Sequence, residues 1–292
     1  MTATIATAVP ARHVPTRRVR FEYPLDDLPK DFTGDPIMSN VLMVLSGMFP
    51  DGEDFFVRSV RNFRDEIDDP ILKEQVKGFI GQEAIHGREH RQFNERLDEL
   101  GYPSKRIERF TKAGLRIREK LLPKKANLAA TAALEHYTAT LAYILLTKPE
   151  ARNTIEHDEV RNLFLWHALE ESEHKAVAFD VYRHVGGSER MRKITMTLFN
   201  IGFPLGILIT AFLSMLLDPV ARRSPRKVWR SIKKLRHTPF VDREIIGLLR
   251  DYQRDDFHPD DHPTDELVAE WRESLFGADG SLVDRLPAKR AS

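Results

Sequence analysis

Apolar residues recur along most of the chain at the three- and four-residue spacing of amphipathic helices, whereas the alternation typical of strands is almost absent. Proline and glycine fall between the apolar runs and mark their ends, for example at 101–103 and 186–187. The pattern therefore predicts an all-α protein. The expected helices cover residues 37–48, 52–67, 70–99, 104–121, 125–147, 157–185, 189–217, 225–236 and 240–254, with a short helix near 264–275.

The same pattern divides the chain into four predicted regions. Residues 37–188 contain the most regular amphipathic runs and are expected to form a helical bundle, while residues 189–254 would add an apolar helix and a basic amphipathic helix. Residues 1–36 and 255–292 are predicted to be tails. The first 20 residues hold four arginines and no acid, and no apolar run follows them, which favours a disordered tail over a secretory signal. We therefore expect a cytoplasmic protein, either free or bound to the inner face of the membrane.

The composition excludes several classes of site. The chain has 292 residues, with 45 Lys and Arg against 44 Asp and Glu, and this near-neutral balance argues against a nucleic-acid coat protein. We predict no nucleic-acid partner, since no recognised binding motif accompanies the basic stretches. The chain has no cysteine, which excludes disulfides, thiolate catalysis and cysteine-ligated zinc or iron–sulfur clusters. Any metal must bind to histidine, carboxylate or main-chain oxygen.

Two copies of a Glu-x-x-His motif suggest such a metal site. Residues three apart lie on the same face of a helix. Glu83 and His86 can therefore bind one ion together, and so can Glu171 and His174. His167 lies four residues before Glu171 and shares its face. Two further predicted helices each carry one acid in an apolar stretch, at Glu53 and Glu135.

The order of these residues, Glu, Glu-x-x-His, Glu and Glu-x-x-His, is the ligand arrangement of ferritin-like four-helix bundles that bind two metal ions. A buried carboxylate without a partner costs several kcal/mol. Four carboxylates would balance the charge of two divalent ions if the histidines are neutral. Carboxylate and imidazole ligands favour iron, with manganese or zinc as alternatives.

Neighbouring acids leave the exact ligands open. Glu170 and Glu173 compete with Glu171, although the helical phase shared with His167 and His174 favours Glu171. Asp54 competes in the same way with Glu53.

Two more histidines lie near the motifs. His90 follows His86 by four residues, so it is an additional ligand, a partner of a ligand, or a catalytic acid or base. His136 directly follows Glu135 and is expected to point about 100° away from it, as a packed or surface residue.

Several stretches together resemble the bacterial family named predicted metal-dependent hydrolases, over roughly residues 15–260. The ligand pattern is also similar to that of di-iron N-oxygenases that oxidise arylamines, which carry an extra histidine four residues before the last glutamate, as His167 stands before Glu171. The stretches that carry the family resemblance are 15–21, 45–56, 79–86, 134–136 and 170–175.

These resemblances imply different chemistries. The family name implies hydrolysis by a metal-activated water. The carboxylate-rich ligand set favours O2-dependent oxidation of a small hydrophobic or amphiphilic substrate, with an external electron donor. A third interpretation is a non-enzymatic bundle that binds or stores metal. The oligomeric state stays open.

Residues 194–217 carry no charge and, at 1.5 Å per residue, are long enough to cross the ~30 Å hydrocarbon core of a membrane. Three interpretations stay open: a buried bundle helix, a membrane anchor that bends near Pro204, and a spanning helix. Residues 218–237 follow with eight cationic residues and one acid, a net charge of +7. Apolar residues lie among these cations, which favours contact of residues 194–237 with an anionic membrane surface.

Overall fold

The first two long helices begin in the same way, with an aspartate followed by a proline. Helix α1 (Pro36–Arg61) starts after Asp35 and helix α2 (Pro70–Glu99) after Asp69. In each case the aspartate side chain accepts hydrogen bonds from the two backbone N–H groups that follow the proline, at 2.7–3.0 Å. These caps satisfy donors that have no partner inside the helix, and proline fits the first helical position because it lacks an N–H group.

The computed structural model describes residues 12–23, 26–217, 225–234 and 242–287. Within these ranges the chain forms helices and no strand, so the predicted all-α bundle is confirmed. The remaining helices are α3 (Ser104–Leu121), α4 (Lys124–Thr147), α5 (Pro149–Arg152), α6 (Asp158–His174), α7 (Val177–His184), α8 (Glu189–Leu217), α10 (Pro225–Lys234), α11 (Arg243–Asp251) and α12 (Asp265–Phe276), with short 3-10 helices at Pro259–Asp261 and Val283–Arg285.

Helix α1 continues through Pro50, where the sequence predicts a break between residues 48 and 52. A proline inside a helix leaves the carbonyl four residues earlier without its N–H donor. That carbonyl belongs to Ser46, and it accepts a hydrogen bond of 2.9 Å from the side-chain amide of Asn94 on α2. A contact from another helix therefore replaces the bond that Pro50 removes.

The predicted helix 157–185 is instead two helices, α6 and α7, separated at Lys175 and Ala176. Both separating residues keep right-handed helical backbone angles, so the interruption is slight. No proline or glycine lies at this position, and the sequence therefore gives no signal for the interruption.

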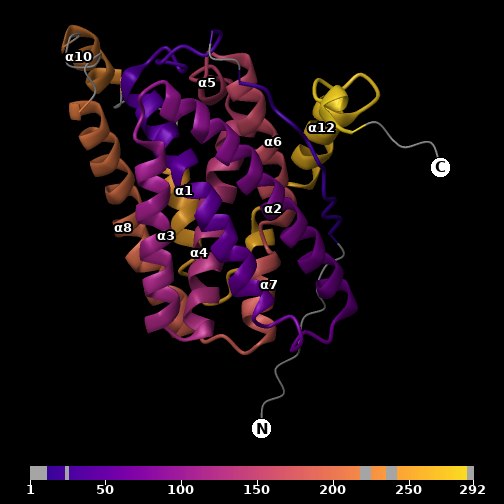
Figure 1. Cartoon of the computed structure of the whole chain (residues 1–292). Coiled ribbons are helices and arrows are strands. Elements are labelled where there is room, and N and C mark those ends of the chain that lie inside the picture. The colour runs from indigo at the N-terminus through magenta and orange to yellow at the C-terminus, as the bar shows by residue number, and fades with distance from the viewer. Residues whose placement is uncertain (1–11, 24–25, 218–224, 235–241, 288–292) are drawn as a thin grey trace.

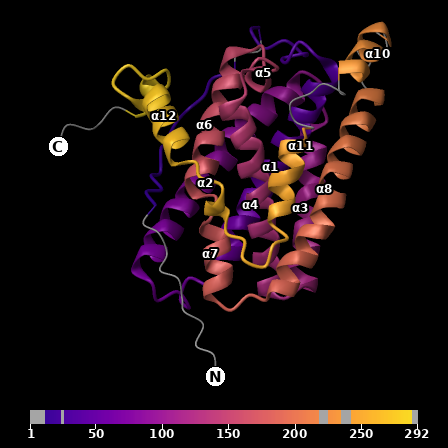
Figure 2. The same ribbon diagram turned by 180° about the vertical axis from the view of Figure 1, so that it is seen from behind.

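Helices α1, α2, α4 and the α6–α7 pair lie side by side and enclose the core (Figure 1). Helix α3 packs against α1, α11 packs against α4, and α12 packs against α6 (Figure 2). The buried apolar side chains form two large clusters at different levels of the bundle, one around Phe93 and Trp166 and the other around Phe79 and Tyr182. Each of the four core elements also carries buried polar side chains, which form a polar layer near the place where the two clusters meet.

The N-terminal segment is not a disordered tail in the part that the structure describes. Val19 and Phe21 are buried in the core, and the chain before them lies against α2. A Cβ atom at Gly78 or Gly81 of α2 would collide with Val14 or Thr16. Two glycines in the interior of a helix therefore have a packing role, because they let the N-terminal segment approach the helix backbone.

Helix α8 packs against α1 and α4 along one side and is exposed along the other. It is the one helix among the described residues that is long and apolar enough to span a membrane, with a mean hydropathy of 1.9 in its most apolar window. Only 22% of that window is buried, so α8 covers one side of the described bundle and leaves its own outer side exposed.

Candidate metal centre

The polar layer between the two apolar clusters contains all eight residues that the sequence marks for metal binding or catalysis. Each has at most 4% of its surface exposed. They come from four helices: Glu53 from α1; Glu83, His86 and His90 from α2; Glu135 from α4; and His167, Glu171 and His174 from α6.

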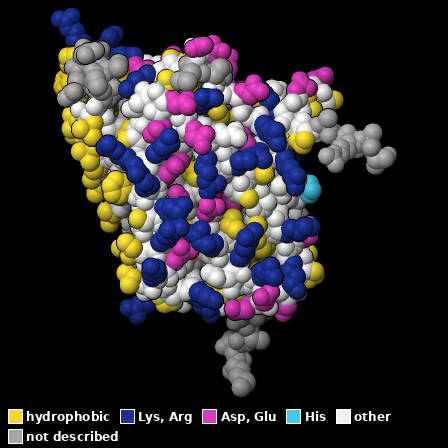
Figure 3. Space-filling model, viewed as in Figure 1, with side chains coloured by type: hydrophobic (Ala, Val, Ile, Leu, Met, Phe, Trp, Pro, Cys, Tyr) yellow, Lys and Arg dark blue, Asp and Glu magenta, His cyan; other side chains and the backbone are white. Residues whose placement is uncertain are grey.

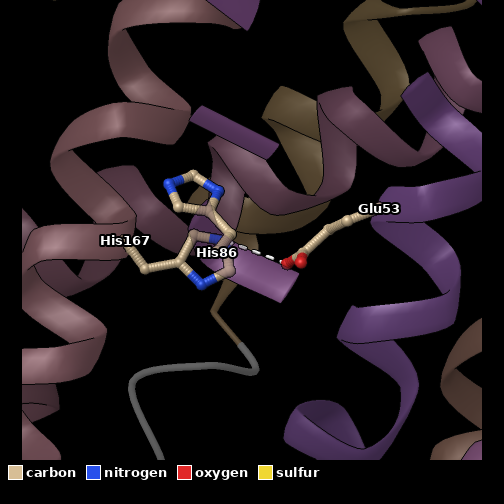
Figure 4. Close-up of side chains that lie close together, drawn as sticks. All are labelled: Glu53, His86 and His167. Atoms are coloured by element: carbon tan, nitrogen blue, oxygen red, sulfur yellow. Dashed lines mark ion pairs between the residues drawn. The ribbon is translucent and has the colours of Figure 1, made fainter. Parts of the chain in front are cut away.

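One group of side chains comprises Glu53, His86 and His167, each of which contributes a potential ligand atom within 4.8 Å of the others (Figure 4). Nε2 of His167 lies 3.6 Å from a carboxylate oxygen of Glu53 and 3.0 Å from one of Glu171. Three helices therefore direct donor atoms toward one place.

A second group comprises Glu83, Glu171 and His174. Nε2 of His174 lies 3.1 Å from Glu83, 3.5 Å from Glu171 and 3.3 Å from an oxygen of Glu135. The two groups adjoin, because the same oxygens of Glu83 and Glu171 each lie 3.7 Å from Nδ1 of His86.

Most atoms that face the middle of the cluster lack a hydrogen-bond partner. They include both carboxylate oxygens of Glu53, Glu83 and Glu135, together with Nδ1 of His86 and Nε2 of His174. Buried polar atoms are normally hydrogen-bonded, and each exception costs free energy. Unpartnered oxygens and imidazole nitrogens that converge in a buried layer fit divalent metal ions, which they would bind as ligands.

The outward-facing nitrogens of two histidines are hydrogen-bonded, which fixes the direction of each ring. Nε2 of His86 lies 2.9 Å from Oε2 of Glu170, and Nδ1 of His174 lies 2.8 Å from Oε1 of Gln82. Outer hydrogen bonds of this kind orient metal-binding histidines. The remaining nitrogen of each ring is thereby left to face the cluster.

Arg17 completes this outer layer, although it belongs to neither Glu-x-x-His motif of the sequence. Its guanidinium donates to Glu170 at 2.9 Å and to Glu173 at 2.7 and 2.8 Å. Glu173 also accepts a hydrogen bond from Gln82 at 2.7 Å. The competing acids Glu170 and Glu173 therefore support the cluster from outside it, whereas Glu171 faces its interior.

His90 lies behind His167, away from the unpartnered oxygens. Its Nε2 atom is 2.8 Å from Nδ1 of His167, and its Nδ1 atom is 2.9 Å from the hydroxyl of Ser46. The imidazole thus joins α1 to His167 on α6, and it makes no direct contact with the carboxylates of the cluster.

The remaining alternatives from the sequence lie outside the cluster. Asp54 is half exposed and forms an ion pair of 2.6 Å with Arg91. His136 is buried on the other side of α4, where its Nε2 atom lies 2.9 Å from the carbonyl oxygen of Leu248. Burial lowers the pKa of His136 to about 4, which keeps it neutral.

Burial and mutual repulsion shape the charges of the cluster. Burial, followed by repulsion from Glu171, raises the pKa of Glu135 to about 7, and burial likewise raises the pKa values of Glu53 and Glu83. Burial would lower the pKa of His174, but its attraction to Glu171 and Glu135 raises that pKa instead. The protein without metal therefore holds protons that a metal ion would displace.

An apolar cavity of about 290 Å³ reaches the cluster from the side of α8. Its lining includes His167 and Glu171 of the cluster together with Phe203, Ile207 and Leu208 of α8. Most of its other lining side chains are apolar residues of α1, α4, α6 and α11. The cluster therefore borders a space that suits an apolar molecule better than water.

Comparison with known proteins gives one match. Residues 15–263 match the model of a protein family described as "Predicted metal-dependent hydrolase", which covers the whole cluster. No curated protein and no solved structure matches the chain.

Proposed function

The chain belongs to the predicted metal-dependent hydrolase family, and we propose that it is an enzyme whose ferritin-like bundle holds two metal ions. The observation that carries this proposal is the convergence of unpartnered buried oxygen and nitrogen atoms from four helices. The proposed ligands are Glu53, Glu83, His86, Glu135, His167, Glu171 and His174.

The charges of the ligands support two divalent ions. Four carboxylates balance a total charge of +4, and burial lowers the pKa of His86, which favours the neutral form that binds metal. Glu83 and Glu171 have oxygens near a histidine of each group, so both acids would help to hold the metal ions. The ligand types favour iron, with manganese or zinc as alternatives.

For the reaction we propose O2-dependent oxidation of a hydrophobic small molecule. Bound iron would supply the redox chemistry that activates O2. The apolar cavity would hold the substrate beside His167 and Glu171 and exclude water. Insertion of one oxygen atom into a C–H bond, with reduction of the other to water, requires two electrons and two protons. We assign the electrons to an external electron-donor protein and the protons to solvent.

His90 has a positioning role in this proposal. Its ring is held by Ser46 and contacts the outer nitrogen of His167, so it orients a ligand without touching the substrate cavity. Burial lowers its pKa, with a further contribution from His167, and this also disfavours a role as a proton donor near pH 7.

Hydrolysis is the second candidate, and the family description favours it. In that reaction the metal ions lower the pKa of a bound water and polarise the substrate. The mostly apolar lining of the cavity offers few groups to hold that water, which is why we place oxidation first. Metal storage without catalysis would need no substrate cavity.

Metal analysis tests the binding site directly. The purified protein should contain two metal ions per chain by mass spectrometry. Glu53→Gln should lose metal, whereas Asp54→Asn, a change of the same kind at the neighbouring exposed acid, should retain it. Equal metal content in both variants would contradict the proposed ligand set.

The reaction class is tested with the loaded protein. After anaerobic loading with Fe(II), admission of O2 should produce rapid O2 uptake at an electrode, and Glu53→Gln should abolish it. A protein that consumes no O2 with iron but cleaves esters or phosphoesters with zinc or manganese would support hydrolysis instead.

A further inference from the structure

The outer side of α8 is a continuous apolar stripe. Leu198, Ile201, Leu205, Phe212 and Leu216 follow one another at helical spacing, and 47–67% of each side chain's surface is exposed. Figure 3 shows hydrophobic side chains along the edge of the molecule where α8 lies. Soluble proteins rarely expose apolar patches of this length, and such a patch marks an interaction surface.

Helix α10 places positive charge at the end of this stripe. Its Lys227 pairs with Asp31, and the hydroxyl of Ser231 donates to Asp35 at 2.6 Å, so this side of α10 faces the start of α1. The other side exposes Arg230 and Lys233 together with Trp229, which has 59% of its surface exposed. Basic side chains around an exposed tryptophan are typical of helices that lie on anionic membranes.

The cavity beside the proposed metal centre reaches the same side of the molecule. Phe203, Pro204, Ile207 and Leu208 of α8 form its wall, and 54% of the surface of Leu208 is exposed. Pro204 has no N–H group for the helix, so the wall is weakened at this turn. The cavity and the apolar stripe therefore lie on two sides of the same helix.

From these observations we propose that α8 and α10 lie on an anionic phospholipid bilayer and that the cavity takes a lipid-like substrate from it beside Pro204 and Leu208. The apolar stripe would enter the acyl region, and the cations of α10 would contact lipid phosphates. The assignment of the cavity as a substrate site rests on the proposed function, whereas the bilayer contact does not.

Vesicle flotation tests the bilayer contact. The full chain should float with vesicles of phosphatidylglycerol and phosphatidylcholine and bind far less to phosphatidylcholine alone. Ile201→Glu should abolish flotation, and Arg230→Glu with Lys233→Glu should weaken it by about tenfold or more. Ile71→Glu, at an exposed position on α2, is the matched control and should bind like the unmodified chain. Circular dichroism confirms that each variant is folded.

Three outcomes would overturn this proposal: absence of flotation, flotation that is independent of anionic lipid, and flotation that Ile201→Glu leaves intact. Size-exclusion chromatography with light scattering tests a fourth outcome, which is dimerisation through the apolar stripe. If the chain is a dimer that Ile201→Glu converts into a monomer, the stripe is an interface between two copies and the bilayer assignment is wrong.

A fluorescent conjugated fatty acid, parinaric acid, tests the cavity in protein treated with a chelator, so that the result does not depend on bound metal. Ala142 is buried and lines the cavity, and Ala142→Phe would fill part of it. We expect this variant to bind the probe at least about tenfold more weakly while floating with vesicles as before. Equal probe binding by the unmodified chain and Ala142→Phe would overturn the cavity assignment. It would not bear on the proposed metal site, which is tested separately by metal analysis.

Discussion

The Nε2 atom of His86 lies 2.9 Å from Glu170, and the opposite nitrogen of the same ring lies 3.7 Å from both Glu83 and Glu171. One imidazole therefore joins the interior of the cluster to its outer layer. Glu170 in turn contacts Arg17, so residues from the start of the chain determine how a proposed ligand on α2 is oriented.

Removal of the Glu170 carboxylate should weaken metal binding without removing a ligand. Glu170→Gln keeps the shape of the side chain but removes the carboxyl group that contacts both His86 and Arg17. We expect metal affinity to fall by about 10- to 100-fold, which is the usual effect of such outer partners. Competition with a chelating dye measures this, with Glu95→Gln at an exposed site on α2 as the control. Unchanged affinity in Glu170→Gln would show that His86 needs no outer partner.

His90 should influence one of the two metal ions more than the other. His90→Phe preserves a ring but removes the hydrogen bond to His167, which belongs to the group with Glu53 and His86. A calorimetric metal titration should then show one weakened and one nearly unchanged binding step. His90→Gln should partly recover the affinity of the weakened step, because its amide can restore a hydrogen bond to His167. Equal weakening of both steps would point to a general packing defect.

The stability of the metal-free protein should fall as pH rises from about 5 to about 8. The folded-state pKa of Glu135 is about 7, above its value in an unfolded chain, so its contribution to stability is complete at low pH and is lost as pH passes that value. Metal binding reverses the direction of this pH dependence, because carboxylates bound to a metal ion hold no proton. The Tm difference between metal-loaded and chelated protein should therefore grow with pH, and Glu135→Gln should flatten the profile of the chelated form. A chelated protein that gains stability over this range would contradict the buried, protonated carboxyls.

The Glu-x-x-His pairs were visible in the sequence because their geometry is set within a single helix, and the described helices bring each pair into the polar layer. Arg17 and Asn94 gave no such signal. Each acts on a residue far away in the chain, and no periodic pattern marks contacts between segments. The exposure of α8 was also not predictable, since an apolar stripe looks the same whether a helix or a lipid covers it.

Arg17 should contribute strongly to stability. Its side chain is 11% exposed, and both of its carboxylate partners are fully buried, so its removal leaves Glu170 without its arginine and Glu173 with Arg272 alone. Breaking a buried pair of this kind costs about 3–5 kcal/mol. In urea titrations, Arg17→Ala should lower the free energy of unfolding by about that amount. Arg18→Ala, at the exposed neighbouring position, should change the free energy of unfolding little. Similar values for the two variants would show that Glu170 and Glu173 tolerate the loss.

Two glycine substitutions should have opposite effects, although both lie within helices. Alanine is favoured over glycine in a helix by about 1 kcal/mol. At Gly114 of α3 a Cβ atom would meet nothing within 4 Å, so Gly114→Ala should stabilise the protein by up to that amount. At Gly81 the same atom would collide with the hydroxyl of Thr16, which neighbours Arg17, so Gly81→Ala should push the N-terminal segment away and destabilise the protein. Urea titrations measure the change in the free energy of unfolding for each variant. The protease sensitivity of the N-terminal segment should rise only in Gly81→Ala. Stabilisation by Gly81→Ala would mean that the N-terminal segment does not lie against α2 in solution.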